Sequence, residues 1–473
     1  MLEKLFKLKA HGTNVKTEII AGFATFMTMA YIVSLNPNLI VRFVGGSDNL
    51  WNAVFLATVL SAAVGTLLMA FLANKPFALA PGMGLNSYFA TVVTTIAATA
   101  KIGYDEAFQG GLAIILISGI LFTILTIFKI REKIVDAIPT GVRFGITAGI
   151  GLMLVYIGVG SNAYVYDSNG VGHTMIGFFT AGASETSKAM GDSYNTMLIY
   201  LLTFFVGLFT IVILNHKKVK GSILYGMLLS SIVFFACEFF ILKENPFASL
   251  EGASFMPAFG DLVDKTLFKF NFETLFKLGF FTTLMTIISF CMVDMFDTIG
   301  TLLGTAAKAN MLDETGKMEN MNKAMLSDSL ATLAGACTGT STVTTFIESA
   351  AGVEEGGRTG LTSVVTGLCF LACMFLAPIA SLIPAPATSA ALVFVGSLML
   401  SALKNVDYDD VSQSVPVVLM LVFMMITSGI GNGIGIGLIS YTIIKLFTGK
   451  VKDISVLTVI LSILFLLKFF IVF

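Results

Sequence analysis

Long apolar runs follow one another along almost the whole chain, with only short polar breaks between them. A helix needs about 20 apolar residues to cross a bilayer core about 30 Å thick, and most of these runs have that length. The pattern predicts an all-α polytopic membrane protein with about fourteen transmembrane segments and no soluble domain. The first segment begins near Glu18. Residues 1–17 are basic and lack a small-residue cleavage site, which predicts a cytoplasmic N-terminal segment.

The third apolar run is broken near its start. Pro81, Gly82 and Gly84 interrupt it before a helix can restart near Leu85. This spacing predicts an extended stretch followed by a half-helix whose N-terminus faces the membrane interior. Asn86 lies in the first turn of that half-helix.

A second break spans residues 338–360, TGTSTVTTFIESAAGVEEGGRTG, between two long apolar runs. It carries Glu348 and is too short and too polar for a lipid-facing helix. Such a segment is tolerated at membrane depth only where it lines a protein-enclosed cavity, so it is the default binding-site candidate. The hydroxyl groups that crowd it belong to Ser341, Thr342, Thr344 and Thr345.

The two halves of the chain are related by weak internal similarity. IPTGVRFGITAGIGLMLV, from Ile138, resembles IPAPATSAALVFVGSLML, from Ile383, and the two breaks match with Asn86 opposite Glu348. A repeat with an odd number of segments must be inverted relative to its partner. Broken helices at corresponding places in inverted repeats are typical of secondary transporters with a midplane site.

Residues 411–447 contain SGIGNGIGIG and are too long for one ordinary helix. We interpret them as a single glycine-broken segment, the thirteenth. This interpretation places Lys445, Lys450 and Lys452 outside, against the cytoplasmic bias of Lys and Arg. If residues 411–447 instead form two segments, these lysines lie in the cytoplasm, in agreement with the bias, and the C-terminus lies outside.

The composition narrows the classes of function. Hydrophobic residues make up 56% of the chain and charged residues 12%, against roughly 25% charged in soluble domains. The formal net charge of -1 argues against a nucleic-acid surface. The five cysteines form no CxxC or Cys/His spacing and are interpreted as packing residues, so neither a metal site nor a cofactor is expected.

Two carboxylates inside the predicted membrane segments are the strongest chemical signal. Intramembrane carboxylates are costly and usually functional, which singles out Asp297 and Glu348. With Asn86 and the backbone N–H groups of two half-helices, they suit a small, planar, neutral ligand with several N–H and C=O groups. Because a carboxyl group in such a cavity can take up and release a proton, Asp297 and Glu348 are also the candidates for proton coupling.

The other acidic residues have simpler interpretations. Asp294 shares a helical face with Asp297, and we interpret it as a structural contact. For Asp328, Glu354 and Glu355, an interfacial position beside polar links fits the pattern as well as a functional one.

At these motifs the chain resembles a known family. LAPGMGLNSYFA, VDMFDTIGTLLG and GTSTVTTFIESAAGVEEGGRTGL are similar to motifs of the AzgA-like adenine/guanine/hypoxanthine permeases, a branch of the nucleobase:cation symporters. The resemblance runs from about Glu18 to the C-terminus. It implies the UraA-type fold, with two inverted seven-segment repeats and short strands before the half-helices of segments 3 and 10. It also implies base binding at Asn86, Asp297 and Glu348, and the DTIGT sequence from Asp297 favours the purine branch.

The same resemblance implies a division into two domains. Segments 1–4 and 8–11 would form a core domain, residues 18–135 and 246–384. Segments 5–7 and 12–14 would form a gate domain, residues 136–245 and 385–473. The related fold also serves anion exchangers, but these would be expected to present a basic residue at the half-helices, and this sequence has none there.

The expected function is uptake of purine nucleobases across the cell membrane by proton symport with alternating access. Guanine and hypoxanthine are favoured over adenine, H⁺ is favoured over Na⁺, and a homodimer is implied by the resemblance alone. An uncoupled facilitator is the alternative, and no nucleophile–base pair indicates an enzyme. Glu348 would accept hydrogen bonds from the purine, Asp297 would bind its opposite edge or carry the proton, and Asn86 would fix its orientation.

An aromatic ring would complete this site by stacking on the base. Phe89, Phe296 and Phe346 all qualify, and Phe346 is included in the candidate site with Thr344.

Overall fold

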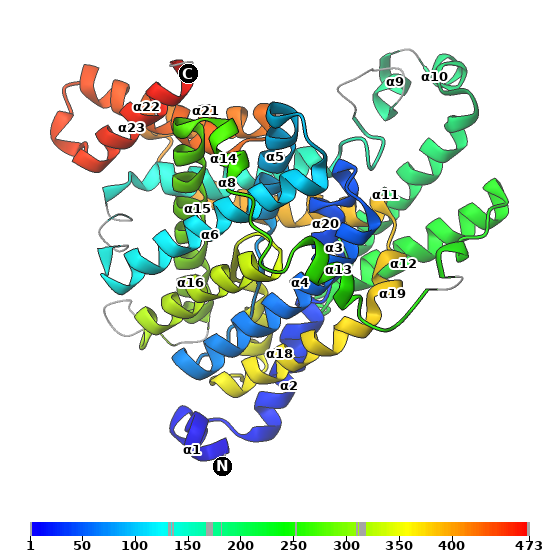
Figure 1. The fold of residues 1–473 in the computed structure, drawn as a ribbon, viewed down its shortest axis with the longest axis horizontal. Helices are drawn as coiled ribbons and strands as arrows, with labels where there is room; N and C mark the ends of the chain where they lie inside the picture. Colours follow the sequence, from blue (N-terminus) through cyan, green and yellow to red (C-terminus); the bar gives the residue numbers. More distant parts are fainter. Residues whose placement is uncertain are drawn as a thin grey trace.

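The computed structural model describes residues 2–130, 134, 137–166, 174–180, 182–250, 253–308, 311 and 318–470. Across these residues the structure is almost entirely helical, and its one sheet pairs two three-residue strands, β1 (Leu79–Pro81) and β2 (Val343–Thr345). Within the described part of the chain, ten segments are helical, long and apolar enough to cross a membrane, and Figure 1 shows how the helices pack together. The expectation of an all-helical membrane protein is confirmed.

The first half of the chain contains β1, against which α3 and α4 pack. The helices of this half are α1 (Leu2–Phe6), α2 (Val15–Met29), α3 (Ile32–Ile40), α4 (Asp48–Leu68), α5 (Met83–Ala100), α6 (Tyr104–Ile127), α8 (Thr140–Gly158), α9 (Met175–Thr180), α10 (Ala183–Met190), α11 (Tyr194–His216) and α12 (Ser222–Cys237).

The second half contains β2. Its helices are α13 (Phe259–Lys265), α14 (Glu273–Leu278), α15 (Phe280–Lys308), α16 (Met321–Thr338), α17 (Ala350–Glu354), α18 (Gly360–Ala372), α19 (Ala377–Ser381), α20 (Ala385–Met399), α21 (Val411–Thr427), α22 (Ile430–Phe447) and α23 (Val456–Phe470).

The two breaks meet at the strands. β1 pairs with β2 in antiparallel register, with Ala80 opposite Thr344. Beyond the strands, the Gly82 N–H donates to the Thr342 carbonyl oxygen at 3.1 Å, and the Phe346 N–H donates to the Ala78 carbonyl oxygen at 3.0 Å. The helix α5 begins directly after β1, and a short helical stretch follows β2. This confirms the expected strands before the half-helices and the inverted relation of the repeats.

The repeats also meet between α8 and α20. Gly151 and Gly396 occupy the same position in the two similar sequences that start at Ile138 and Ile383. A Cβ atom on Gly151 would lie 2.6 Å from the Gly396 carbonyl oxygen, and one on Gly396 would lie 2.5 Å from the Gly151 carbonyl oxygen. Glycine at both positions is therefore required for the two backbones to touch.

Residues 411–447 differ from expectation. They form two helices, α21 and α22, rather than a single glycine-broken segment. The chain turns at Ser428, whose φ is 46°, and the two helices then pack side by side. A Cβ atom on Gly437 would lie 2.3 Å from the Met420 Cε atom. The glycines of SGIGNGIGIG thus permit close helix packing as well as a turn.

Because residues 411–447 form two helices, the lysines at the end of α22 lie on the side of the membrane opposite to the one expected. Lys445 Nζ lies 3.7 Å from Asp410 Oδ2, just before α21, and 3.3 Å from Asp453 Oδ2. Hydrogen bonds from the hydroxyl and N–H of Ser412 lower the pKa of Asp410 to about 2, so this carboxylate stays ionised beside Lys445. The end of α22 therefore returns to the side where α21 begins, which removes the conflict with the Lys and Arg bias.

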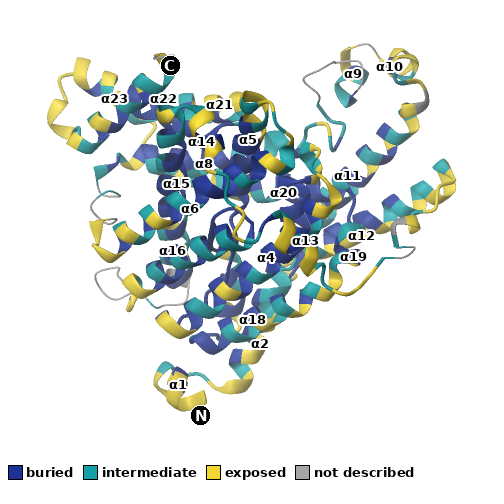
Figure 2. Ribbon diagram, in the orientation of Figure 1, coloured by how far each residue is buried: buried dark blue, intermediate teal, exposed yellow. Residues whose placement is uncertain are grey.

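Buried side chains gather at the centre of the bundle, and exposed ones lie along its outer helices (Figure 2). Many of the exposed side chains are large and apolar, such as Phe209 on α11 and Ile232 on α12, which are 58% and 63% exposed. Apolar side chains on the outside and polar ones inside are expected of a protein whose solvent is lipid.

Candidate functional site

A cavity of about 380 Å³ lies where the two breaks meet α8, α15 and α20. Its volume is in the range of small-molecule sites, about 300–1,000 Å³. Of the residues expected from the sequence to form the site, the following line it: Gly82, Gly84, Asp297, Thr344, Phe346 and Glu348.

Glu348 follows β2 in a short 3₁₀ turn, Ile347–Ser349. The Tyr31 hydroxyl donates to Glu348 Oε1 at 2.7 Å, and the Thr28 hydroxyl donates to the Glu348 carbonyl oxygen at 3.3 Å. Tyr31 lies between α2 and α3 and is only 1% exposed. Its hydroxyl therefore holds one carboxylate oxygen in place and leaves the other for a ligand.

Asp297 reaches the same cavity from α15. The next residue, Thr298, is fully buried. Its hydroxyl donates to Asp328 Oδ2 at 2.5 Å and lies 3.0 Å from the Thr344 hydroxyl. Asp297 thus lines the cavity, whereas its neighbour ties α15 to α16 and β2.

Asp328 is an anchor for β2. It is fully buried on α16 and accepts hydrogen bonds from the Thr345 N–H at 2.9 Å and from the Thr345 hydroxyl at 3.0 Å. The interfacial interpretation is therefore wrong for Asp328. Glu354 and Glu355 are exposed, and Glu355 pairs with Lys220, so these two do fit the interfacial interpretation.

Asp294 has a structural contact, as expected. It is 1% exposed, and its Oδ2 accepts a hydrogen bond from the Thr332 hydroxyl at 2.9 Å. Asp294 does not line the cavity.

Asn86 lies beside the cavity without lining it. The side chain is fully buried. Its Nδ2 donates to the Pro81 carbonyl oxygen at 3.2 Å, and its Oδ1 accepts a hydrogen bond from the Ser341 hydroxyl. Asn86 therefore ties the first turn of α5 to the second break.

The start of α5 is brought close to the acidic side chains by a glycine. A Cβ atom on Gly82 would lie 2.8 Å from Thr344 Cγ2 and 3.9 Å from Asp297 Oδ2. The N-terminus of a helix carries partial positive charge. The partial positive charge at the N-terminus of α5 thus stabilises the negative charge of the Asp297 carboxylate.

Two of the three aromatic candidates line the cavity. Phe296 and Phe346 do so, together with Phe144 of α8. Phe89 is fully buried and packs edge-on against Phe108, with ring centroids 5.1 Å apart. The position of Phe89 rules out stacking on a ligand in this cavity.

Several lining residues were not anticipated from the sequence. Tyr31, Phe144, Thr147, Thr301 and Asn405 belong to this group. Each lies in or beside an apolar run, where a single aromatic or hydroxyl residue looks like a packing residue. Near Tyr31, the signal in the sequence is Pro37 with its flanking Asn36 and Asn38, which lie inside α3.

The described lining residues include two carboxyl groups, several hydroxyls and four aromatic rings, but no Lys, Arg or His. Such a set can accept hydrogen bonds from N–H groups and can stack on a planar ring. An anion would meet two carboxyl groups without a compensating cation.

A polar cavity between two broken helices at the centre of a membrane-spanning bundle is the site of a membrane transport protein. The chain belongs to the Permease family, whose profile matches residues 16–436. It is 37% identical to the adenine permease AdeP of Escherichia coli, over 99% of this chain and 96% of that protein. It is 36% identical to the guanine/hypoxanthine permease PbuO of Bacillus subtilis, over 99% of this chain and all of that protein.

These relatives confirm the resemblance to the adenine/guanine/hypoxanthine permeases and identify the chain as a transporter, not an enzyme. The solved transmembrane domain of a cyanobacterial bicarbonate transporter, BicA, shares the fold, with a TM-score of 0.61 and 14% identity over 89% of this chain and 97% of that chain. The murine anion transporter Slc26a9 in its inward-facing state has a TM-score of 0.60 and 10% identity over 91% of this chain and 68% of that chain. At such identities the likeness concerns the fold alone.

Proposed function

We propose that this protein takes up purine nucleobases across the plasma membrane by proton symport. The observation that carries the proposal is that Asp297 and Glu348 face one cavity whose described lining contains no cationic side chain. Relatives named as adenine and guanine/hypoxanthine permeases support the purine class. The carboxyl groups argue against an anionic substrate of the kind that the structural neighbours carry.

The cavity suits a purine with N–H groups on its edge. Glu348 accepts hydrogen bonds from ring and exocyclic N–H groups, Asp297 binds the opposite edge or carries the proton, and the Thr344 hydroxyl adds a further partner. Phe346 or Phe296 stacks on the ring. An acceptor-rich pair favours guanine or hypoxanthine, whose N1–H is a donor, over adenine, whose N1 is an acceptor. Asn86 acts by positioning the start of α5.

Transport follows from relative motion of a core domain and a gate domain. The proposed core, residues 18–135 and 246–384, contributes Asp297 and Glu348 to the cavity, whereas the proposed gate, residues 136–245 and 385–473, contributes Phe144 and Val395. Each set of helices packs mainly within itself, which supports the division. The expected boundary at residues 135 and 136 lies outside the described residues and falls between α6 and α8.

We orient the protein with its N-terminus in the cytoplasm, because the basic lead-in lies beside other basic loops. The Thr13 hydroxyl donates to the Gly356 carbonyl oxygen at 3.5 Å, and the adjacent Glu355 pairs with Lys220. A homodimer through the exposed apolar faces of the gate domain completes the proposal.

The test is uptake of radiolabelled guanine, hypoxanthine, adenine and uracil into cells that lack their own carriers. We expect saturable purine uptake that collapses with a protonophore and is lost in Glu348→Gln. Glu354→Gln is the matched control, because that carboxylate is exposed and does not line the cavity. Uptake that survives both the protonophore and Glu348→Gln would instead establish an uncoupled facilitator. Uptake that requires Na⁺ and ignores the protonophore would replace H⁺ by Na⁺ as the coupled ion.

A further inference from the structure

A second cavity, of about 460 Å³, lies further along α5. One wall of it is a continuous hydroxyl face of that helix, formed by Ser87, Thr91, Thr94, Thr95 and Thr99. A transmembrane helix with so many hydroxyl groups on one face is not explained by packing against lipid. Contact with lipid therefore does not account for the hydroxyl face.

Four of these hydroxyls, those of Ser87, Thr91, Thr94 and Thr95, donate their hydrogens within the helix. The Thr91 hydroxyl donates to the Ser87 carbonyl oxygen at 3.1 Å, and the Thr94 hydroxyl donates to the Ala90 carbonyl oxygen at 2.9 Å. A hydroxyl that donates its only hydrogen still has lone pairs to accept hydrogen bonds. The cavity wall therefore offers a row of hydrogen-bond acceptors. The carboxyl groups of the central cavity are hydrogen-bond acceptors too.

The opposite wall is different. It contains apolar and aromatic side chains from α3 and its extension, Leu39 and Phe43, together with Ile157 at the end of α8. Asn162 adds one amide. An acceptor row facing an aromatic and aliphatic wall suits a flat molecule with N–H groups on its edge.

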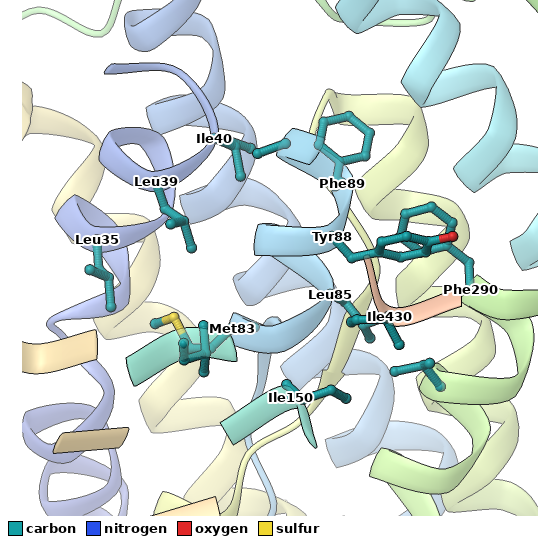
Figure 3. Close-up of a cluster of buried hydrophobic side chains, with 14 of the residues drawn as sticks. Leu35, Leu39, Ile40, Met83, Leu85, Tyr88, Phe89, Ile150, Phe290 and Ile430 are labelled. Carbon is teal, nitrogen blue, oxygen red and sulfur yellow. The ribbon is translucent and has the colours of Figure 1, made fainter. Parts of the chain in front are cut away.

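An apolar layer separates the two cavities. Along α5, the central cavity is lined by residues 82–84, and the second cavity begins at Ser87. Between them, Leu85, Ile150 and Ile430 are buried, and Figure 3 shows these side chains gathered in one cluster. The layer is tight, because a Cβ atom on Gly84 would lie 2.1 Å from Ile150 Cγ2.

The two cavities extend toward opposite ends of the bundle. The central cavity reaches Ser401 and Asn405, just before the contact of Asp410 with Lys445. Arg143 at the start of α8 and Lys445 at the end of α22 line one cavity at that end, and these basic side chains make it the cytoplasmic end in the proposed orientation. The second cavity, beyond the apolar layer, is then on the external side.

We propose that the second cavity is an external subsite that binds the incoming nucleobase before it passes the layer of Leu85, Ile150 and Ile430. This inference rests on the proposed purine transport. The hydroxyl face of α5 accepts hydrogen bonds from N–H groups of the base, and the wall with Phe43 contacts its ring. Opening of the apolar layer then transfers the base to Asp297 and Glu348.

The first test measures uptake kinetics of guanine for the double variant Thr91→Val and Thr94→Val. Removing two acceptors should raise KM about threefold to tenfold and leave the maximal rate unchanged, since the central site is intact. Thr123→Val on α6 is the matched control: its hydroxyl also donates to a carbonyl four residues earlier, that of Gly119, at 2.8 Å, and it lines neither cavity. An unchanged KM in the double variant overturns the subsite.

The second test separates the subsite from the central site. Thr94→Cys is labelled from outside with a membrane-impermeant maleimide, relative to the parent protein, with and without guanine. We expect guanine to slow the labelling both in the wild-type background and with Glu348→Gln, because the subsite does not use Glu348. Protection that disappears with Glu348→Gln rejects the subsite but leaves the proposed function standing. Absence of saturable purine uptake by the wild type rejects the proposed function itself.

Discussion

At the scale of single residues, the contact between Tyr31 and Glu348 explains how a carboxylate can be held ready for a ligand inside a membrane protein. Glu348 is only partly buried, and its Oε1 accepts a hydrogen bond from the Tyr31 hydroxyl at 2.7 Å. A hydrogen bond to a charged group contributes about 1.5–3 kcal/mol. Tyr31 thus positions the Glu348 carboxylate of the proposed site, although it looks like a packing residue in the sequence.

Tyr31→Phe should therefore weaken substrate binding while the fold is retained. We expect KM for purine uptake to rise about tenfold, because Glu348 loses the donor that fixes its orientation. The measurement is initial uptake rate against concentration, with the amount of protein in the membrane determined in parallel. Tyr200→Phe serves as the control, since Tyr200 on α11 packs against the rings of Tyr164 and Phe234 and does not line the central cavity. A KM equal to that of the wild type would show that the Tyr31 hydroxyl has no part in binding.

At the scale of elements, the sequence indicated both breaks because their residues conflict with the surrounding apolar pattern. Pro81 and Gly82 cannot continue a helix, and Glu348 is too costly for a lipid-facing position. The hairpin of α21 and α22 could not be predicted in the same way, because glycine signals both a turn and close helix packing. Whether the glycines of this region mark a turn, close packing or both depends on the contact of Gly437 with Met420, which only the folded structure defines.

Glu18 is another residue whose role is set by tertiary structure. It lies in the first turn of α2 and is fully buried. Its carboxylate accepts hydrogen bonds from the Arg358 N–H at 2.9 Å, from the Thr362 N–H at 3.1 Å and from the Thr362 hydroxyl at 2.6 Å. A side chain from α2 thus caps the start of α18, more than 300 residues later.

Glu18→Ala should destabilise this junction strongly. Each buried donor that loses its partner costs about 1–3 kcal/mol, so we expect a clear fall in the thermal unfolding temperature of the purified protein. Glu106→Ala is the control, because Glu106 occupies the first turn of α6 but is exposed. If the two variants unfold at the same temperature, the buried hydrogen bonds of Glu18 do not support the fold.

At the scale of the whole molecule, the repeats meet at two places with different roles. Gly151 and Gly396 bring α8 and α20 into backbone contact, and the pairing of Ala80 with Thr344 joins the two breaks. The first contact lies within the proposed gate domain and the second within the proposed core domain. Each proposed domain would thus be built from both repeats, with the central cavity between the two.

A single substitution in the apolar layer between the cavities is expected to shift the balance between conformational states of the whole protein. Gly84 on α5 lies against Ile150 on α8, and an added methyl group would lie 2.1 Å from Ile150 Cγ2. Gly84→Ala should therefore force α5 and α8 apart and favour the state that is open to the outside. We expect faster labelling of an introduced Thr147→Cys by an external impermeant maleimide, together with slower uptake.

A second substitution distinguishes this shift from simple misfolding. Ile150→Ala removes the side chain that the new methyl group would strike, so the combination with Gly84→Ala should restore the uptake rate and slow the labelling again. Contacting residues are expected to show such non-additive effects. If the uptake losses caused by Gly84→Ala and by Ile150→Ala simply add in the double variant, the apolar layer does not act as a barrier that opens and closes. In that case Gly84 would be required only for the fold of the half-helix, and the apolar layer would not control access to Asp297 and Glu348.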